Sequence, residues 1–277
     1  MKGSSVPPKI NAPFVEKVLV AFIRDELGRC SCRKALLGLS GGLDSAVCAT
    51  LAVRALGPRN VLGLIMPYGK AFPKDVRDAK ALAGRLGIRH ETIDIAPQID
   101  LYFAAHPTTS RLQRGNKMAR ERMSVLYDYS VRKGGFVLGT SNKTELLVGY
   151  GTVYGDLACA INPMGDLYKT QVRRLATHLG VPAAIRRKAP TAGLWPGQTD
   201  EGELGLTYDE LDRILYGLVE GRRTRRQVIE DGHDAAAVDR VLRMIKASDF
   251  KRTLPPIAKL STRTVGHDFL YPRDREG

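Results

Sequence analysis

Apolar and polar positions follow two different periods along the N-terminal half of the chain. Apolar side chains recur every three or four positions over four stretches, which predicts amphipathic helices at residues 14–27, 43–56, 73–87 and 117–133. Short, continuous apolar runs lie around and between these stretches and predict buried strands at residues 34–40, 60–67, 89–95 and 135–141. Beyond residue 165 the spacing is mainly helical.

Strands that alternate with helices through short connections predict an α/β fold, with a parallel sheet covered by helices on both faces. The helical spacing beyond residue 165 adds a helical C-terminal part. We expect one domain over residues 1–277, with a disordered lead-in at 1–12 and a tail at 261–277. Parallel sheets bind ligands at the carboxyl ends of their strands, so the residues after each predicted strand are the first candidates for a site.

The turn after the first predicted strand reads GLSGGLDS, residues 38–45. Free backbone amides at the start of the next helix, together with the helix dipole, attract phosphate, and Gly41 and Gly42 let its oxygens approach closely. Asp44 is negative and suits a magnesium ion bridging to the phosphates. Alternatively, Asp44 favours the helix dipole and Ser40 caps the helix. That alternative needs only one small residue rather than Ser-Gly-Gly.

The charge of the chain is strongly positive, with 43 Lys and Arg against 29 Asp and Glu, a net charge of +14. Such a balance is typical of nucleic-acid binding, but it also suits anionic small substrates. Aromatic residues make up only 6% of the chain, which leaves little material for stacking on bases. We therefore expect no nucleic-acid partner.

The cysteines and the apolar runs indicate a cytoplasmic protein with no membrane partner. No apolar run approaches the length of a bilayer, and the N-terminus has no secretory pattern. We interpret the four cysteines as reduced thiols, with a structural zinc site or a redox pair as the alternative. The spacing of the first pair is too short for the usual zinc knuckle. The four are Cys30, Cys32, Cys48 and Cys159.

The SGGxDS motif, matched at Ser40, Gly41, Gly42, Asp44 and Ser45, resembles the pyrophosphate loop of ATP pyrophosphatases. Other segments of the chain indicate which family of that superfamily it resembles. In order and separation, the chain from about residue 14 to 260 closely resembles the ammonia-dependent NAD synthetases. The segments that carry this resemblance are GNKMARERM (115–123), VLGTSNKTELLVGYGTVYGD (137–156), NPMGDLYKTQVRRLA (162–176), PTAGLWPGQTDEGELGLTYDELD (190–212) and KRTLPP (251–256).

The resemblance implies a Rossmann-like fold of the ATP pyrophosphatase type and a homodimer. It also implies an ATP- and Mg²⁺-dependent ligase that amidates deamido-NAD with ammonia. The reaction passes through an adenylated carboxylate, releases AMP and pyrophosphate, and is the last step of NAD biosynthesis.

Carried over position by position, the resemblance implies a role for each of the following residues. Asp44 and Glu145 hold the metal, and Asp44 and Lys169 are catalytic. ATP contacts Gly38, Leu39, Ser40, Gly41, Gly42, Leu43, Asp44, Ser45, Thr140, Lys169 and Thr191, and deamido-NAD contacts Arg120, Asp156 and Lys251.

Several of these residues have a plainer interpretation. Glu145 three residues after Asn142 is typical of a helix cap. Lys169 suits a surface lysine, or a cation that neutralises charge developing on phosphate. Arg120 lies in a basic helix, where a solvated face is the default. Residues 190–201, PTAGLWPGQTDE, are too irregular for a helix and suit either a lid over the nucleotide or a static loop.

The chain departs from the family pattern at Val153, Ala160 and Phe250, which stand where many members have lysine, aspartate and histidine. The expected dinucleotide contacts are therefore less well matched than the ATP contacts. Two alternatives remain: a tRNA-modifying adenylating enzyme, favoured by the basic charge, and a non-catalytic nucleotide-binding protein.

The sequence also carries expectations about the nitrogen source and the assembly. About 33 residues precede the first predicted strand, too few for an amidase domain that would release ammonia from glutamine. We therefore expect free ammonia as the donor. The helix at 14–27 is apolar yet precedes the first strand, so it is available to pack against a second copy of the chain.

Overall fold

The computed structural model describes residues 7–107, 110–195 and 197–265. Its centre is a four-stranded parallel sheet in the order β3-β2-β1-β4. Ala35 of β1 lies opposite Val61 of β2 and Phe136 of β4. The predicted parallel α/β sheet is thus confirmed. The strands are β1 (Ala35–Gly38), β2 (Val61–Ile65), β3 (Arg89–Thr92) and β4 (Phe136–Val137).

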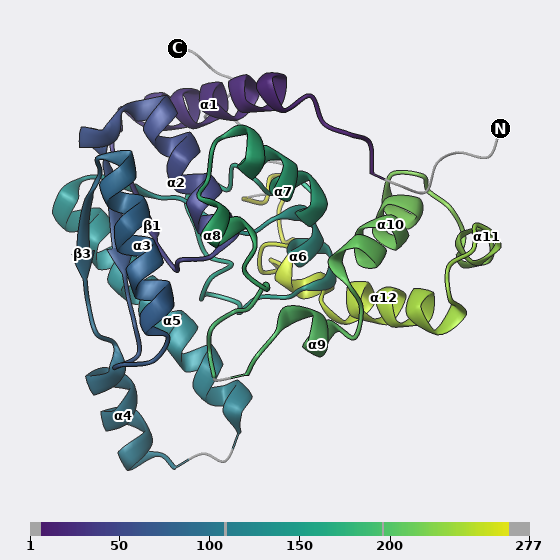
Figure 1. Cartoon of the computed structure of the whole chain (residues 1–277). Coiled ribbons are helices and arrows are strands. Elements are labelled where there is room, and N and C mark those ends of the chain that lie inside the picture. Colours follow the sequence, from purple (N-terminus) through teal and green to yellow (C-terminus); the bar gives the residue numbers. More distant parts are fainter. Residues whose placement is uncertain (1–6, 108–109, 196, 266–277) are drawn as a thin grey trace.

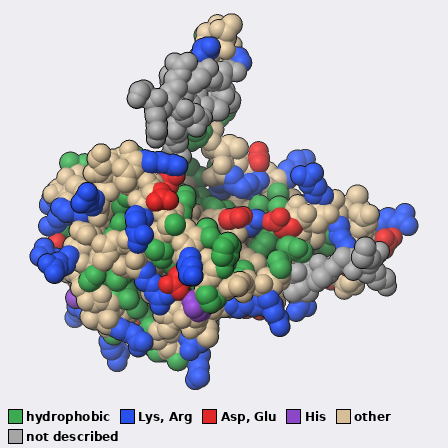
Figure 2. Space-filling view, turned by 90° about the horizontal axis from the view of Figure 1, so that it is seen from above, with side chains coloured by type: hydrophobic (Ala, Val, Ile, Leu, Met, Phe, Trp, Pro, Cys, Tyr) green, Lys and Arg blue, Asp and Glu red, His purple; other side chains and the backbone are tan. Residues whose placement is uncertain are grey.

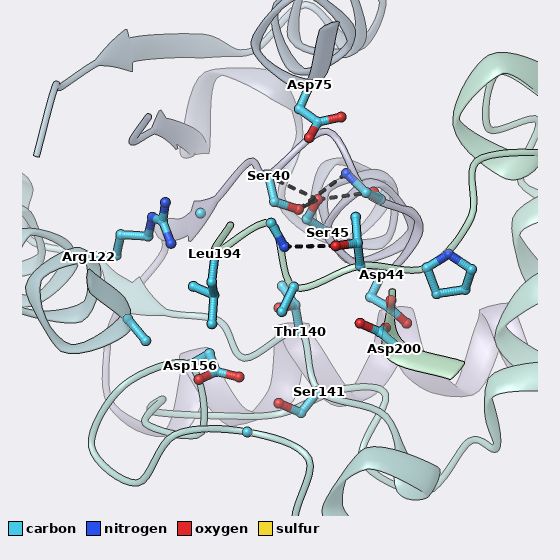
Figure 3. Close-up of a pocket in the computed structure, with 18 of the residues that line it drawn as sticks. Ser40, Asp44, Ser45, Asp75, Arg122, Thr140, Ser141, Asp156, Leu194 and Asp200 are labelled. Carbon is cyan, nitrogen blue, oxygen red and sulfur yellow. Dashed lines mark hydrogen bonds between the residues drawn. The ribbon is translucent and has the colours of Figure 1, made fainter. Parts of the chain in front are cut away.

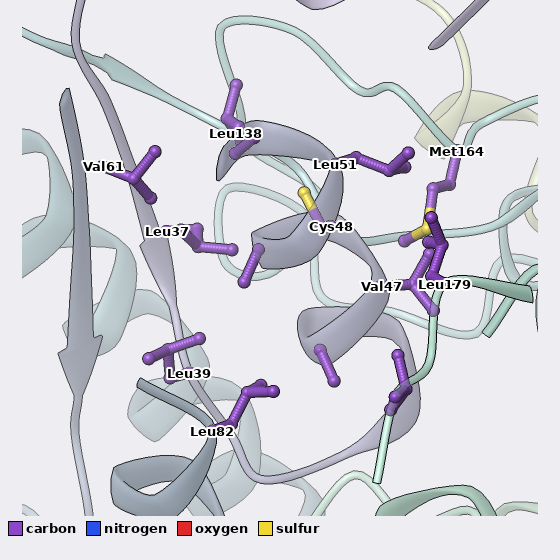
Figure 4. Packing of buried hydrophobic residues seen from close by; sticks show 14 of the residues in the cluster. Leu37, Leu39, Val47, Cys48, Leu51, Val61, Leu82, Leu138, Met164 and Leu179 are labelled. Carbon is purple, nitrogen blue, oxygen red and sulfur yellow. The ribbon is translucent and has the colours of Figure 1, made fainter. Parts of the chain in front are cut away.

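Side chains of β1 and β2 alternate between two apolar layers. Leu37, Leu39 and Ile65 face a core formed with α1, α2, α3 and α7 (Figure 4). Leu36 and Leu64 face the opposite layer, formed with α4 and α5. The period of two in a strand therefore places helices on both faces of the sheet. The helices of these layers are α1 (Ala12–Arg29), α2 (Leu43–Leu56), α3 (Pro73–Leu86), α4 (Ala96–Ala105), α5 (Arg111–Lys133) and α7 (Lys169–His178).

The remaining helices lie mostly in the C-terminal part of the chain. A separate apolar core around the fully buried Tyr208 joins α6, α10, α11 and α12. The last three of these helices lie on the side of the molecule away from β3 (Figure 1). The expected helical C-terminal part is confirmed. Its helices are α6 (Lys143–Val148), α8 (Ala183–Arg186), α9 (Asp200–Leu204), α10 (Tyr208–Val219), α11 (Arg225–Glu230) and α12 (Ala235–Ala247).

Several boundaries differ from those expected. The strand expected at 135–141 pairs only at Phe136–Val137, with a single further bridge from Leu138 to Ile161. The helix expected at 117–133 begins earlier, at Arg111, because Ser110 caps it through the Gln113 amide. Residues 7–12 of the expected lead-in are described: Ala12 already begins α1, and the Pro8 carbonyl accepts a hydrogen bond from Gln171. Residues 1–6 and 266–277 lie outside the described residues.

The thiols and the surface give three further results. The four cysteines are free thiols. Over the described part of the chain, no helix combines the length and the apolar character needed to cross a membrane. On the face shown in Figure 2, Lys and Arg side chains are scattered among other types rather than gathered in one stripe.

Candidate active site

A cavity of about 820 Å³ opens at the carboxyl ends of the strands. Its walls come from the pyrophosphate loop (residues 38–45), the loop after β4, the inner side of α5, and the segment 188–195. Figure 3 shows Asp44 and Asp200 at one end and Arg122 at the other, with Ser40 and Ser45 between them. Such a position is where parallel sheets bind ligands, and the residues that follow β1 and β4 do meet there in one site.

The pyrophosphate loop folds around its own serines. The Ser40 and Ser45 hydroxyls are 3.0 Å apart, the Gly42 amide donates to Ser40 Oγ at 3.2 Å, and Ser45 Oγ donates to the Gly42 carbonyl at 3.1 Å. α2 begins directly after Gly42, so the amides of its first turn have no carbonyl partners within the helix. Amides and hydroxyls are therefore grouped at a positive helix end, which is suited to phosphate oxygens.

Lys169 stands beside this loop between two carboxylates. Its Nζ is 2.6 Å from Asp44 Oδ2 and 3.0 Å from Glu145 Oε1, and only 3% of the side chain is exposed. The interpretation as a surface lysine is therefore wrong. The backbone of Lys169 is also fixed, because its amide donates to Thr144 Oγ1 at 2.9 Å. Thr144 in turn donates to the fully buried Asp212.

Burial and charge set the protonation of this cluster. Burial alone would lower the pKa of Lys169, but Asp44 and Glu145 outweigh it and raise that pKa, so the ammonium group stays charged. Burial raises the pKa of Glu145 to about 7, with the Asp44 charge adding to the effect and Lys169 opposing it. The cluster thus combines a permanent cation with two carboxylates that a further cation or a proton can neutralise.

Asn142 connects the helix cap to the cluster. Its Oδ1 accepts from the Glu145 amide at 3.1 Å, and its backbone amide donates to Glu145 Oε2, so the capping box is present. Its Nδ2 donates to Asp44 Oδ1 at 3.1 Å. The cap interpretation of Glu145 is therefore confirmed, and it coexists with the contact to Lys169. Asn142 itself was recognised from the sequence only as a cap.

Charged side chains line the other end of the cavity. Asp156 opens to the cavity, and its Oδ1 accepts the Thr152 amide at 2.8 Å. Burial raises the pKa of Asp156, with Thr152 and Lys251 opposing the shift. Lys251 Nζ donates to the Gly149 and Gly151 carbonyls at 2.7 and 2.8 Å, and Arg122 Nε donates to the Met66 carbonyl at 3.0 Å. Arg122 was not selected from the sequence, because it lies in a basic helix.

The segment 190–201 covers part of the cavity. The Leu194 amide donates to Gln198 Oε1 at 2.8 Å, which closes the turn. At its end, Asp200 accepts hydrogen bonds from the hydroxyls of Tyr150 at 2.9 Å and Tyr208 at 3.0 Å. Asp200 is 4% exposed and was another residue that the sequence pattern did not single out, because TDEGE reads as a solvated helix start.

The structure brings most of the expected site residues to this cavity, but not all of them. Thr140, Thr191, Asp156 and Lys251 line it together with the pyrophosphate loop. Gly41 is the one residue of the loop that does not line the cavity, because it packs against the backbone of α3. Arg120 is exposed outside the cavity, at a second, shallower groove, and donates to the Val153 carbonyl at 3.1 Å.

The positions that depart from the family pattern lie at or near the surface. Phe250 is 64% exposed and Ala160 is exposed, whereas Val153 is half-buried. None of the three lines the main cavity among the described residues. The departures therefore leave the end of the cavity at the pyrophosphate loop unchanged.

Comparison with known proteins agrees with this geometry. The NAD synthase family matches residues 15–255. The NH₃-dependent NAD⁺ synthetases of Chlorobaculum tepidum and Trichlorobacter lovleyi are 52% and 49% identical over 261 and 265 residues. The first match covers 94% of each chain, and the second covers 96% of this chain and 97% of the relative.

Two solved structures have the same fold. The NMN synthetase of Francisella tularensis superposes with a TM-score of 0.81 at 36% identity, over 90% of this chain and 99% of that one. The NH₃-dependent NAD synthetase of Campylobacter jejuni gives 0.78 at 33% identity, over 90% and 100%. The chain therefore belongs to the NAD synthase family.

Proposed function

We propose that this protein is a ligase that makes NAD from deamido-NAD, ATP and ammonia. The observation that carries the proposal is the buried Asp44–Lys169–Glu145 cluster, which adjoins a phosphate-binding turn inside one cavity. The similarity to NH₃-dependent NAD⁺ synthetases over 94% of the chain supports the choice of acceptor and nitrogen donor.

The residues of the cavity divide the work between binding and charge stabilisation. The amides and hydroxyls of the pyrophosphate loop hold the β- and γ-phosphates of ATP. Lys169 lies beside them and stabilises the negative charge that grows on the phosphates while the nicotinate carboxylate attacks the α-phosphorus. Pyrophosphate leaves with the electrons of the broken P–O bond. Ammonia then attacks the adenylated carboxyl carbon, AMP leaves with the electrons of the broken C–O bond, and the new amide nitrogen gives up a proton to solvent.

Magnesium fits the donor set of this site. Asp44 and Glu145 supply two hard carboxylate oxygens. Among the described residues, no group of three His, Cys, Asp or Glu side chains forms a site in which the protein alone would surround a metal. Mg²⁺ commonly takes one or two carboxylates and completes its shell with phosphate oxygens and water. Asp44 and Glu145 would hold the ion, which would neutralise charge on the ATP phosphates.

The test of the proposal is an assay of AMP, pyrophosphate and NAD with purified protein, ATP, magnesium and ammonium. We expect NAD to form in equal amount to AMP when deamido-NAD is supplied. Adenylation of a tRNA acceptor, with no NAD formed, would instead support a tRNA-modifying enzyme. Nucleotide binding without release of AMP would support a non-catalytic protein. The expected absence of a nucleic-acid partner and the cytoplasmic location stay predictions.

A second acceptor has support from two observations. The NMN synthetase of Francisella tularensis is among the similar structures, and Val153 replaces a lysine expected to contact the dinucleotide. Nicotinic acid mononucleotide therefore belongs in the same assay. A higher kcat/KM with the mononucleotide than with deamido-NAD would overturn the dinucleotide assignment while leaving the chemistry unchanged.

The nitrogen source gives a further prediction. We expect ammonium to support NAD formation and glutamine, freed of contaminating ammonia, to support almost none. Because only the deprotonated amine is a nucleophile, the rate at limiting ammonium should rise with pH until the protein loses its fold. Equal rates with glutamine and ammonium would contradict the assignment of ammonia as the donor.

A homodimer is the expected assembly, and α1 offers a surface for it. The stripe Phe14, Val18 and Phe22 is 63%, 47% and 37% exposed, whereas Ile23 and Leu27 on the opposite side of α1 are buried. A second copy covering this stripe would remove its apolar area from water.

We expect light scattering to give the mass of two chains for the native protein and of one chain for Val18→Asp. Val219 is 37% exposed at the end of α10, so Val219→Asp is a matched control that should keep the mass of two chains. A native mass near 30.4 kDa would contradict the dimer.

A further inference from the structure

Lys188 lines the cavity where the pyrophosphate loop meets the start of α3. Its Nζ donates to the Gly41 carbonyl at 2.8 Å and forms ion pairs with Asp75 at 2.7 Å and Asp78 at 2.6 Å. Only 15% of its side chain is exposed. One side chain therefore joins the pyrophosphate loop, the start of α3, and the chain that leads into the segment 190–201.

Gly41 meets α3 with no space for a side chain. Its φ is +76°, a region that favours glycine, and a Cβ atom there would lie 2.3 Å from the Asp75 carbonyl oxygen. Figure 3 shows Asp75 on the opposite side of the loop from Thr140 and Ser141. The loop thus packs against the backbone of α3, and Lys188 contacts both of them.

Lys188 also balances charge next to a site for anions. If the ammonium group were absent, Asp75, which lines the cavity, and Asp78 beside it would be two uncompensated carboxylates next to the pyrophosphate loop. Burial disfavours the charged lysine, but the paired carboxylates of Asp75 and Asp78 outweigh burial and raise the pKa of Lys188. The ammonium group is therefore present throughout the neutral range.

The contact with Gly41 fixes the direction of one peptide group. In a trans peptide the carbonyl and the following N–H point in opposite directions. The Gly41 oxygen points at Lys188, so the Gly42 amide points to the other side, where it donates to Ser40 Oγ at 3.2 Å. If this peptide turned over, a carbonyl oxygen would face the phosphates instead of an amide. Such a change would replace attraction with repulsion.

We propose that Lys188 is a positioning residue for ATP, which holds the Gly41 carbonyl away from the phosphates and so keeps the pyrophosphate loop in its anion-binding form. The inference rests on the proposed function, because it assumes that the loop binds the phosphates of ATP. It assigns to Lys188 an effect on ATP and none on the dinucleotide.

The experiment compares Lys188→Met, Lys188→Arg and the triple variant Lys188→Met, Asp75→Asn, Asp78→Asn. We expect Lys188→Met to raise the KM for ATP at least about tenfold, the scale of one hydrogen bond to a charged group, with the KM for deamido-NAD unchanged. Lys188→Arg should recover part of the loss, because it keeps a charged donor. The triple variant removes the unbalanced carboxylates, and it should stay impaired because the Gly41 carbonyl is still not held.

Lys143 provides a matched control. It is also a half-buried lysine between two carboxylates, Asp166 and Glu220, but it lies outside the cavity. Lys143→Met should therefore lose thermal stability without a change in the KM for ATP. The same pattern in Lys188→Met, or equal rises in both KM values, would overturn the inference. Full recovery in the triple variant would also overturn it, since charge balance alone would then explain the lysine.

Calorimetric titration with a non-hydrolysable ATP analogue and magnesium separates this inference from the proposed function. If the native protein binds the analogue but makes no NAD, the proposed function fails. A selective loss of binding in Lys188→Met would still support the positioning role in that case. Unchanged binding in Lys188→Met, with normal NAD synthesis by the native protein, would reject the role of Lys188 alone.

Discussion

Replacing Lys169 with methionine is expected to lower kcat by about a hundredfold or more, the scale seen when one preorganised charge-stabilising donor is removed from an active site. The ammonium group of Lys169 is buried and is held by Asp44 and Glu145. The backbone of Lys169 is fixed by its hydrogen bond to Thr144. The ammonium group therefore needs no reorganisation when charge develops on the phosphates. The rate of pyrophosphate release at saturating substrates measures the effect.

A fall in kcat can be assigned to Lys169 only if the variant keeps its fold. Methionine has nearly the length of lysine but leaves Asp44 and Glu145 side by side without a cation. Glu145, whose pKa burial raises to about 7, can take up a proton and relieve the repulsion. We therefore expect a folded protein with a lowered thermal midpoint and retained binding of deamido-NAD. An unchanged kcat would return Lys169 to a purely structural role.

Much of the sheet was predictable because local signals agree with tertiary packing. The helix at 43–56 was predicted with the boundaries of α2, since Gly42 and Gly57 end the regular backbone on both sides. α4 was not predicted. Its sequence, APQIDLYFAA, buries only Ile99 fully and shows no clear apolar face, so contacts with α5 rather than periodicity define it. The predicted strands were too long where the chain turns out of the sheet into the loops of the site, as it does after Val137.

The site was predictable where residues share a motif and unpredictable where they meet only in three dimensions. Asp44 and Glu145 follow two strands of one parallel sheet, so their proximity follows from topology. The burial of Lys169 does not, because nothing local distinguishes it from a surface lysine. Lys188 meets Gly41 across 147 positions, and its RRK neighbourhood resembles a solvated charge run. Resemblance identified Lys169, whereas only the structure identified Lys188.

Replacing Asp44 with asparagine is expected to abolish most turnover while the fold survives. The two side chains have nearly the same shape, but their hydrogen-bonding capacity differs. Asp44 accepts from Lys169 at one oxygen and from Asn142 at the other. An amide has one acceptor oxygen and one NH₂ donor group. Either Lys169 or Asn142 would therefore face this NH₂ group, which cannot accept its hydrogen bond. The variant therefore disturbs the cation beside the phosphates and removes one of the two carboxylates suited to magnesium.

The two consequences are separable by varying magnesium. Loss of a carboxylate ligand should raise the magnesium concentration needed for half-maximal rate, whereas displacement of Lys169 should lower kcat even at saturating magnesium. Asp166 is 95% exposed outside the cavity, so Asp166→Asn is a matched control for the change of one charge and should keep native kinetics. Because Asp44 contacts Lys169 and is proposed as a magnesium ligand, we expect both effects in Asp44→Asn. Native turnover of that variant at limiting magnesium would remove Asp44 from the metal site, and native kcat at saturating magnesium would show that Lys169 keeps its position without it.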